Sequence, residues 1–393
     1  MMKAAIYKDF NAPIEIKSVK RPKLKAPTSV IVQVMATGVC RSDWHGWKGH
    51  DDDIKNHGLP FIPGHEVSGI VVETGASVEK LKNGDRVAIP FILSCGYCAE
   101  CQLNKPTVCL EQAQPGFTMY GSFAEYVEIS RADRNLRVIP SEVSFVEAAA
   151  LGCRFTTAYR AVVQQGLGIV RTGHSDCSKT MNKDKAILST KDWVNDAKKI
   201  ICIFGCGGLG LSCVMIAKAF QEEGNIQSII AVDISKDALD KALELGANHV
   251  VNAKALGMKN DSVLEKVLEL TNGLGAELTI DAAGFPSTCE NAVHACRRGG
   301  RMVQVGLPIG GRPPQIPMGS VAGKELEIVG SHGFAATELP DLLELVKTGK
   351  LPVKKLIQKE VSLIDGVQAL MAMDHESPLG MTVITRFDDS SRL

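Results

Sequence analysis

The sequence has 393 residues, 45% of them hydrophobic, with 44 basic and 44 acidic side chains. That length is enough for two domains with separate cores. The balanced charge provides no net positive field for a nucleic-acid backbone, and the aromatic content of 5% is low for base-stacking surfaces. Both features disfavour a nucleic-acid-binding protein.

The N-terminal stretch MMKAAIYKDFNAP has neither an apolar segment behind a basic start nor a small-residue cleavage site. We therefore expect no signal peptide and a cytoplasmic protein. Cysteines in that compartment are reduced, so disulfides are not expected.

Residues 1–150 contain short β-branched runs separated by turns, such as SVIVQVMATG, EVSGIVVETG and GDRVAIP. This pattern predicts a mostly antiparallel, barrel-like domain. Three motifs in or just after this region carry chemically active side chains. GVCRSDWH contains Cys40, Ser42, Asp43 and His45; PGHE contains His65 and Glu66; and LGCRFTTAY contains Cys153.

Four further cysteines, Cys95, Cys98, Cys101 and Cys109, follow the spacing C-x2-C-x2-C-x7-C. Reduced cysteines at two-residue separations are zinc ligands more often than anything else. An iron–sulfur cluster is the alternative, but this spacing does not match the ferredoxin patterns well. The spacing predicts a closed, tetrahedral zinc site with a structural role.

The longest apolar run, at 200–220, is broken by glycines, so a membrane span is the weaker interpretation. The stretch KKIICIFGCGGLGLSCVMIAKAF instead indicates a buried strand, a glycine turn and an apolar helix. Gly205, Gly207 and Gly210 have the G-x-G-x-x-G spacing of a dinucleotide site. They would permit the tight turn, the close approach of a pyrophosphate and close packing of helix on strand, respectively.

The next strand, SIIAVDI, contains Asp233. Its separation along the sequence from the glycine motif is that expected of a carboxylate that binds a ribose 2′-hydroxyl. Because such a carboxylate repels a 2′-phosphate, NAD is favoured over NADP. The alternative role for Asp233 is the N-cap of the helix that starts near Lys236. Gly208, Leu209 and Lys236 complete the predicted cofactor-binding set.

Strands and helices continue to alternate through LGANHVVNA, ELTIDAAG, a helix around STCENAVHACRRG, GRMVQVGLP and LEIVGSHG. This order predicts a parallel, doubly wound sheet and an α/β fold. The last segment contains two helical patterns, TELPDLLELVKTG and DGVQALMAM, and a closing strand, GMTVITRF, which we expect to return to the first domain.

The sequence predicts a nucleotide-binding fold and a four-cysteine zinc site. Together with these, the scattered Cys and His residues of the first domain indicate a second metal site. Each alone is ordinary, since a single Cys is usually a small buried group and a lone His a satisfied structural residue. Two thiolates and one imidazole would leave a tetrahedral zinc ion one open position, as in catalytic sites.

Together these motifs resemble the zinc-dependent medium-chain dehydrogenase/reductase family, specifically its alcohol dehydrogenases. The resemblance is carried by GVCRSDxH at 38–45, GHE at 64–66, the four-cysteine spacing at 95–109, GC at 152–153, GxGGxG at 205–210 and Asp233. It implies a GroES-like, β-rich catalytic domain formed by 1–154 and 333–393. A Rossmann NAD-binding domain would occupy 155–332. It also implies NAD, two zinc ions per subunit, an alcohol or aldehyde substrate and a homodimer or homotetramer.

The resemblance also implies roles for single residues. Cys40, His65 and Cys153 would bind a catalytic zinc ion, and Cys95, Cys98, Cys101 and Cys109 the structural one. Ser42 would take the alcohol's proton and pass it through the cofactor ribose to His45. Asp43 would orient His65, Glu66 would stabilise or transiently coordinate the zinc, Phe91 would line the pocket, and Arg41 would contact the pyrophosphate. For Arg41 and Asp43 the alternative is a solvated surface pair.

Other functions remain open. Polyol dehydrogenases of this superfamily commonly have Glu at the place of Cys153, so this cysteine favours other alcohols. A zinc-free quinone or enone reductase would lack the zinc ligands, and a zinc-ribbon nucleic-acid binder would need a basic face.

Two segments depart from the family pattern. Relatives have only a handful of residues where this chain has an insertion at about 169–199, which we expect to be a surface excursion or a subunit contact. The final tripeptide, SRL, resembles the peroxisomal address SKL. Peroxisomal or glycosomal import is therefore the alternative localisation if the source is a eukaryote.

Overall fold

The computed structural model describes residues 1–169, 199–308 and 312–387. The chain divides into two compact units, one formed by Met1–Thr156 and Gly333–Leu393 and the other by Thr157–His332. Most of the predicted insertion, at 170–198, and the SRL tail lie outside the described residues.

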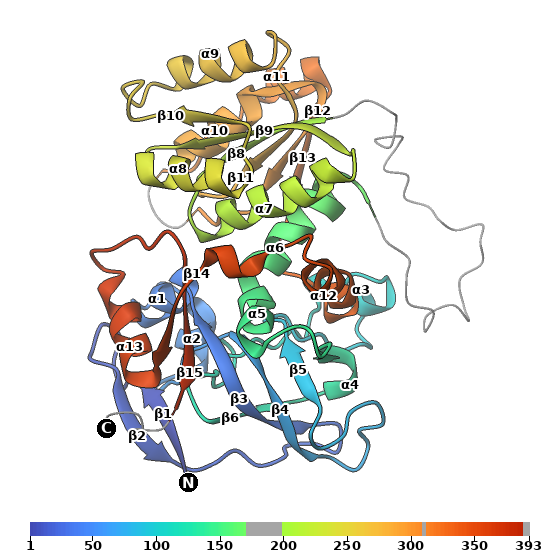
Figure 1. The fold of residues 1–393 in the computed structure, drawn as a ribbon, viewed down its shortest axis with the longest axis vertical. Helices are drawn as coiled ribbons and strands as arrows, with labels where there is room; N and C mark the ends of the chain where they lie inside the picture. The colour runs from blue at the N-terminus through green and yellow to red at the C-terminus, as the bar shows by residue number, and fades with distance from the viewer. Residues whose placement is uncertain (170–198, 309–311, 388–393) are drawn as a thin grey trace, which may run out of the picture. The chain divides into compact units, whose positions relative to one another are not determined.

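A sheet of seven strands forms the centre of the first unit (Figure 1). Its order is β14-β15-β3-β4-β5-β7, with β6 beside β3, and only the β14–β15 pair is parallel. The mostly antiparallel prediction is confirmed. The strands are β3 (Val30–Val39), β4 (Glu66–Thr74), β5 (Arg86–Ile89), β6 (Tyr126–Ile129), β7 (Arg137–Val138), β14 (Ile357–Ser362) and β15 (Met381–Arg386). A separate antiparallel pair consists of β1 (Met2–Ile6) and β2 (Glu15–Val19).

The register of β3 and β4 brings distant motifs together. Gly38 pairs with Glu66 in this antiparallel ladder. The chain therefore leaves β3 at Cys40 beside the point where it enters β4 from His65. Strand β3 is buried along most of its length because β-branched side chains such as Val32 and Val34 fill the core on one side of it.

Helices of the first unit connect and cover this sheet. Helix α1 starts directly after Cys40, and α5 starts at the capping box of Ser144 and Glu147. A π-helical turn, Leu151–Phe155, continues α5 and contains Cys153. The α-helices are α1 (Arg41–Trp47), α2 (Asp52–His57), α3 (Ala99–Gln102), α4 (Ala132–Asn135), α5 (Phe145–Ala150), α12 (Leu339–Lys347) and α13 (Leu363–Ala372), with 3₁₀ turns at Pro106–Val108, Ala336–Glu338 and Val353–Leu356.

The second unit is a six-stranded, fully parallel sheet of order β10-β9-β8-β11-β12-β13. Numbered within the unit this is 3-2-1-4-5-6, the order of dinucleotide-binding folds. The predicted doubly wound sheet is confirmed. The strands are β8 (Lys199–Phe204), β9 (Ile226–Asp233), β10 (His249–Asn252), β11 (Ala276–Asp281), β12 (Cys296–Gln304) and β13 (Glu327–Gly330).

Helices of this unit lie on both sides of its sheet (Figure 1). They are α6 (Thr156–Tyr159), the π-helical segment Arg160–Gly166, α7 (Gly208–Glu222), α8 (Lys236–Leu245), α9 (Asn260–Leu270), α10 (Pro286–His294) and α11 (Met318–Lys324). The helix predicted around STCENAVHACRRG ends earlier than expected. Cys296 is buried and pairs with Ala276, so the chain from there on belongs to β12.

The long apolar run is accounted for by this packing. Helix α7 has 15 residues and packs against β8 and β9. Among the described residues, no helix is both long and apolar enough to cross a bilayer.

Candidate functional site

One cluster in the first unit unites the scattered motifs. Ligand atoms of Cys40, His65, Glu66 and Cys153 all lie within 4.8 Å of one another. The strand ends of β3 and β4 supply the first three, and the π-helical turn after α5 supplies Cys153. π-Helical turns are often found at functional sites, where the extra residue redirects a side chain.

His65 is held in one orientation by Asp43. The carboxylate Oδ1 of Asp43 lies 2.8 Å from His65 Nδ1 and also accepts the Gly64 N–H at 3.0 Å, while Oδ2 accepts the Cys40 N–H at 3.2 Å. Asp43 is only 1% exposed, so the surface-pair alternative is wrong for this residue.

The other ring nitrogen of His65, Nε2, is buried and has no hydrogen-bond partner among the described residues. Burial lowers the pKa of His65, but the Asp43 carboxylate and the Cys40 thiolate outweigh it and raise the pKa well above the usual value. The thiol of Cys153 lowers the pKa of Cys40, because it donates a hydrogen bond to the thiolate. A thiolate beside an orphaned imidazole nitrogen is a donor set that fits a zinc ion.

No sequence motif indicated which residue pairs with Glu66. Arg154 Nε donates to Glu66 Oε1 at 3.1 Å and its Nη2 to Oε2 at 3.3 Å. Burial raises the pKa of Glu66 to about 7, although Arg154 opposes the shift. The guanidinium also donates to the Val39 carbonyl at 3.1 Å, so Arg154 braces the ends of β3 and β4.

Two aromatic rings enclose His65. Its ring centroid lies 6.0 Å from that of Phe91 and 5.1 Å from that of Phe117. Phe91 belongs to the predicted set, but Phe117 does not, since nothing in the sequence indicates its proximity. Both rings are buried and would keep water away from a ligand beside His65.

Helix α1 carries the other predicted residues of this unit. The hydroxyl of Ser42 lies 3.8 Å from Cys40 Sγ, within the cluster's immediate surroundings. His45 is half-buried one turn further on, and its Nδ1 lies 3.1 Å from His50 Nδ1. Arg41 donates to the carbonyls of Met373 at 2.6 Å and Glu376 at 2.8 Å.

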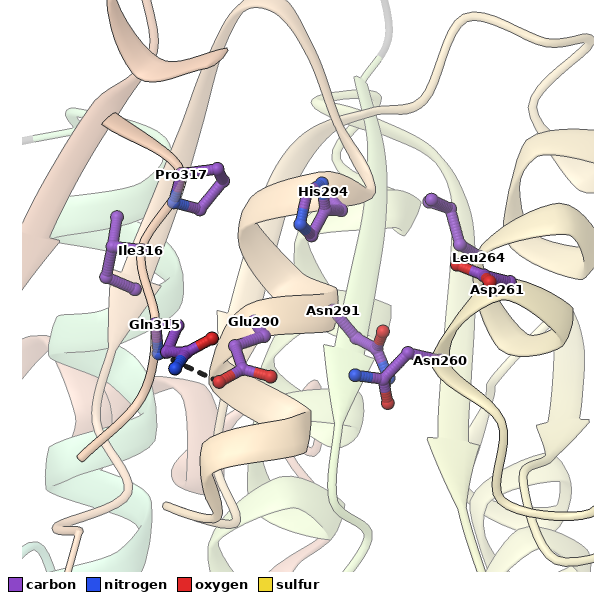
Figure 2. Close-up of a pocket in the computed structure, with 9 residues that line it drawn as sticks. All are labelled: Asn260, Asp261, Leu264, Glu290, Asn291, His294, Gln315, Ile316 and Pro317. Carbon is purple, nitrogen blue, oxygen red and sulfur yellow. Dashed lines mark hydrogen bonds between the residues drawn. The ribbon is translucent and has the colours of Figure 1, made fainter. Parts of the chain in front are cut away.

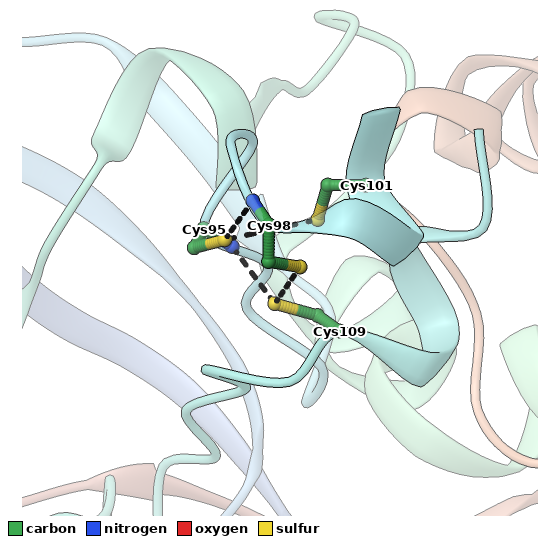
Figure 3. Close-up of side chains that lie close together, drawn as sticks. All are labelled: Cys95, Cys98, Cys101 and Cys109. Atoms are coloured by element: carbon green, nitrogen blue, oxygen red, sulfur yellow. Dashed lines mark hydrogen bonds between the residues drawn. The ribbon is translucent and has the colours of Figure 1, made fainter. Parts of the chain in front are cut away.

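The second cluster consists of Cys95, Cys98, Cys101 and Cys109 (Figure 3). Sγ atoms of Cys95 and Cys101 lie 3.9 Å apart, and those of Cys98 and Cys109 lie 3.8 Å apart. Four thiolates around zinc with bonds of about 2.3 Å have S–S separations of about 3.8 Å by tetrahedral geometry. None of the four forms a disulfide.

Backbone N–H groups donate hydrogen bonds to the sulfur atoms of this cluster, although burial raises the pKa of Cys109 to about 12. The N–H groups of Tyr97 and Cys98 donate to Cys95 Sγ at 3.4 and 3.2 Å, and the N–H of Cys95 donates to Cys109 Sγ at 3.2 Å. Hydrogen bonds from the backbone lower the pKa of Cys98 to about 6. The geometry and the donor atoms therefore fit the predicted zinc clip.

The glycine loop of the second unit joins β8 to α7. Gly205 has a φ of 93°, which disfavours a side chain. A Cβ at Gly210 would collide with the Gly205 carbonyl oxygen, whereas a Cβ at Gly207 would meet nothing within 4 Å. Gly207 is the N-cap of α7, and Gly208 and Leu209 form its first turn, so the space above Gly207 faces free N–H groups. This arrangement fits a phosphate group.

Asp233 ends β9 beside this loop. Its Oδ2 accepts the Cys206 N–H at 2.6 Å and its Oδ1 the Ser235 N–H at 2.8 Å. The N-cap of α8 is Ser235, which accepts from Ala238 N–H, so the alternative role of Asp233 as the cap is wrong. Lys236 is paired with Asp240 at 2.5 Å on the exposed side of α8.

A surface pocket lies between α9, α10 and residues 315–317 (Figure 2). Its polar centre is Glu290, which accepts from the N–H of Gln315 at 2.8 Å and from Arg312 at 2.7 Å. None of the predicted site residues lines this pocket.

Two family models match the chain, "Alcohol dehydrogenase GroES-like domain" over residues 26–140 and "Zinc-binding dehydrogenase" over residues 208–348. An alcohol dehydrogenase of Geobacillus stearothermophilus is 34% identical over 91% of this chain and 92% of its own. The chain belongs to the zinc-dependent alcohol dehydrogenase family. It is an oxidoreductase, and the non-enzymatic alternative of a zinc-ribbon nucleic-acid binder is thereby wrong.

More distant members have the same architecture. The D-arabinose 1-dehydrogenase (NADP(+)) of Saccharolobus solfataricus is 31% identical over 98% of this chain and 97% of its own. The crystal structure of the alcohol dehydrogenase of Aeropyrum pernix superposes with a TM-score of 0.78 at 28% identity and covers 98% of this chain and 99% of that chain. The expected GroES-like and Rossmann folds are confirmed.

Proposed function

We propose that this dehydrogenase oxidises primary or secondary alcohols reversibly to aldehydes or ketones and transfers the hydride to NAD. The observation that carries the proposal is the buried cluster of Cys40, His65 and Cys153, with an orphaned imidazole nitrogen. Three protein ligands leave a tetrahedral metal one position for substrate. Bound zinc would acidify the alcohol, and bound nicotinamide would accept the hydride.

The residues around the cluster have distinct tasks. Asp43 accepts the Nδ1 proton of His65, so Nε2 would offer its lone pair to zinc once metal binding displaces the second ring proton. Ser42 takes the alcohol's proton, and His45, further along α1, delivers it towards solvent. Glu66 balances the charge of Arg154 beside the metal position, and it would stabilise the zinc ion or coordinate it transiently.

The second unit is proposed as the NAD-binding domain. Its glycine loop, formed by Gly205, Gly207, Gly208, Leu209 and Gly210, would hold the pyrophosphate at the N-terminus of α7. Each oxygen of Asp233 accepts one backbone N–H and has a further lone pair for a ribose hydroxyl. Lys236 and Arg41 stay predicted cofactor contacts.

The remaining expectations are proposals of the same kind. Each subunit would hold two zinc ions, the second at the four-cysteine clip, and the subunits would form a homodimer or homotetramer. The domains would divide at 154/155 and 332/333. The protein would be cytoplasmic, or peroxisomal or glycosomal if the SRL end serves as an address in a eukaryote.

A polyol or sugar dehydrogenase is the second candidate. One relative carries the name D-arabinose 1-dehydrogenase (NADP(+)). Against it stands Cys153, because polyol dehydrogenases of the resembled family commonly have Glu at that place. The carboxylate of Asp233 likewise favours NAD over NADP.

A panel of alcohols tests the proposal. Initial rates of NAD and NADP reduction are measured with primary, secondary, aromatic and polyol substrates. The proposal predicts NAD reduction with simple alcohols at rates well above those with polyols. Faster turnover of polyols or preference for NADP would favour the second candidate, and no turnover of any alcohol would contradict both.

A further inference from the structure

Two histidines of the first unit share a contact that the proposed function does not use. His45 Nδ1 and His50 Nδ1 lie 3.1 Å apart, which is hydrogen-bond distance for two ring nitrogens. Two neutral imidazoles form such a bond when one nitrogen carries the proton and the other offers its lone pair.

Local packing fixes the two rings. The His50 N–H donates to the His45 carbonyl at 3.0 Å, so the chain folds back on the end of α1. The Trp44 ring stands edge-on to both, with centroids 4.8 Å from His45 and 5.7 Å from His50. Trp44 is itself held by Asp374, which accepts from its Nε1 at 2.8 Å.

The two histidines differ in their access to water. His45 is half-buried, whereas His50 is exposed. Burial, then the neighbouring His50 and Arg41, lower the pKa of His45 to about 4. A protonated His45 therefore loses its proton readily and needs an acceptor within reach.

We propose that His50 extends the proton relay: it accepts the proton from His45 and releases it to solvent. This inference rests on the proposed function, because it extends the relay that begins at Ser42. It makes His50 a residue that acts through His45 and touches no reacting atom.

The transfer balances without any redox partner. A proton binds to His45 Nε2, the ring nitrogen that the His50 contact leaves free. The Nδ1 proton of His45 crosses to His50 Nδ1, and His50 releases its Nε2 proton to a buffer base. Exchange of both rings with solvent restores the starting tautomers.

Asp51, the N-cap of α2, directly follows His50 in the chain, and other charged groups lie nearby. On and beside α1 they are Arg41, the Cys40 thiolate and Lys48. Asp374, in the segment after α13, accepts a hydrogen bond from Trp44, the ring that packs against both histidines. It also forms an ion pair with Lys48, with the nitrogen and oxygen 3.2 Å apart. These groups set the local field, but His50 contacts His45 directly.

Stopped-flow measurements on the zinc-loaded protein test the inference with His50→Gln. NADH absorbance and the colour of a pH indicator are followed together in weak buffer during alcohol oxidation. In wild type the two signals should rise in step. In the variant, proton release should lag by about tenfold, and added imidazole should remove the lag.

The matched control is His57→Gln, since His57 is also exposed but lies at the end of α2. This variant should behave as wild type. Proton release that stays in step with NADH in His50→Gln, with no response to imidazole, would overturn the inference.

A second readout is independent of turnover. With ¹⁵N-labelled histidine, NMR titration of His50→Gln should show a higher His45 pKa than in wild type, because the neighbouring imidazole no longer opposes protonation. An unchanged His45 titration would also overturn the inference. A wild-type protein with coupled titrations but no alcohol turnover would contradict the proposed function alone.

Discussion

At the scale of single residues, the most informative atom is His65 Nε2. Burying an imidazole nitrogen without a partner costs free energy, so proteins rarely leave one in that state unless a ligand satisfies it. Asp43 holds Nδ1, which leaves Nε2 beside the thiols of Cys40 and Cys153. The arrangement therefore fits the proposed metal ion.

Cys153→Ser tests this arrangement. A serine hydroxyl is a far weaker zinc ligand than a thiolate, so we expect the loss of one of two zinc ions and a fall in alcohol oxidation of at least about 100-fold. Zinc content by mass spectrometry and initial rates provide the measurement. Cys289→Ser, in the core of α10, is the control that should keep both zinc ions. Full zinc content in Cys153→Ser would exclude Cys153 as a ligand.

His45 links the site to stability in acid. Because its pKa is lowered from 6.5 to about 4 in the folded chain, the unfolded chain binds more protons between these pH values. Stability should therefore fall as pH drops through that window. His45→Gln should flatten this part of the curve, as followed by urea unfolding at pH values from 7 to 4. An unchanged slope would show that His45 titrates normally.

At the scale of elements, the β8–α7 turn separates two roles for glycine. Gly210 is needed for packing, because a Cβ there would collide with the Gly205 carbonyl. Gly207 is not needed for packing, since a Cβ there meets no protein atom within 4 Å. Its side of the loop is free for a ligand to approach.

The variants Gly210→Ala and Gly207→Ala should differ accordingly. Both should weaken NAD binding, but only Gly210→Ala should lower the free energy of unfolding, by about 1–3 kcal/mol. Urea unfolding and NADH fluorescence titration measure the two effects. Tight NAD binding by Gly207→Ala would contradict a pyrophosphate site at this turn.

Elements were predictable from the sequence to different degrees. Glycine spacing and strand alternation predicted the parallel sheet, because each is a local signal. The partnership of Glu66 and Arg154 was not predictable, because 88 positions separate them and only the return of the chain after α5 joins them. The same holds for Phe117 beside His65. Strand β12 starts earlier than predicted because Cys296 is buried in the core, and secondary-structure propensity does not indicate burial.

At the scale of the whole molecule, the chain combines two units with separate cores. Both groups of candidate metal ligands lie in the unit of Met1–Thr156 and Gly333–Leu393, and the glycine loop lies in the other. The motifs identified the candidate ligands along the sequence. They did not show that Cys40, His65 and Cys153 come together, because this depends on the β3–β4 register.

The four-cysteine clip should contribute to stability rather than chemistry. Cys98→Ser should remove the second zinc ion and lower the melting temperature, because the loop 95–109 loses its cross-link. Calorimetry with and without added zinc measures the effect. Zinc should raise the melting temperature of wild type more than that of the variant, and an equal response would argue against a structural ion in this clip.

The most direct measurement follows deuterium from the carbinol carbon of an accepted alcohol into the reduced cofactor, before and after zinc is removed and restored. We predict that the label appears in NADH, that transfer stops when zinc is removed, and that added zinc restores it. Transfer that continues in a zinc-free protein, or alcohol oxidation that leaves the cofactor unlabelled, would contradict zinc-dependent hydride transfer.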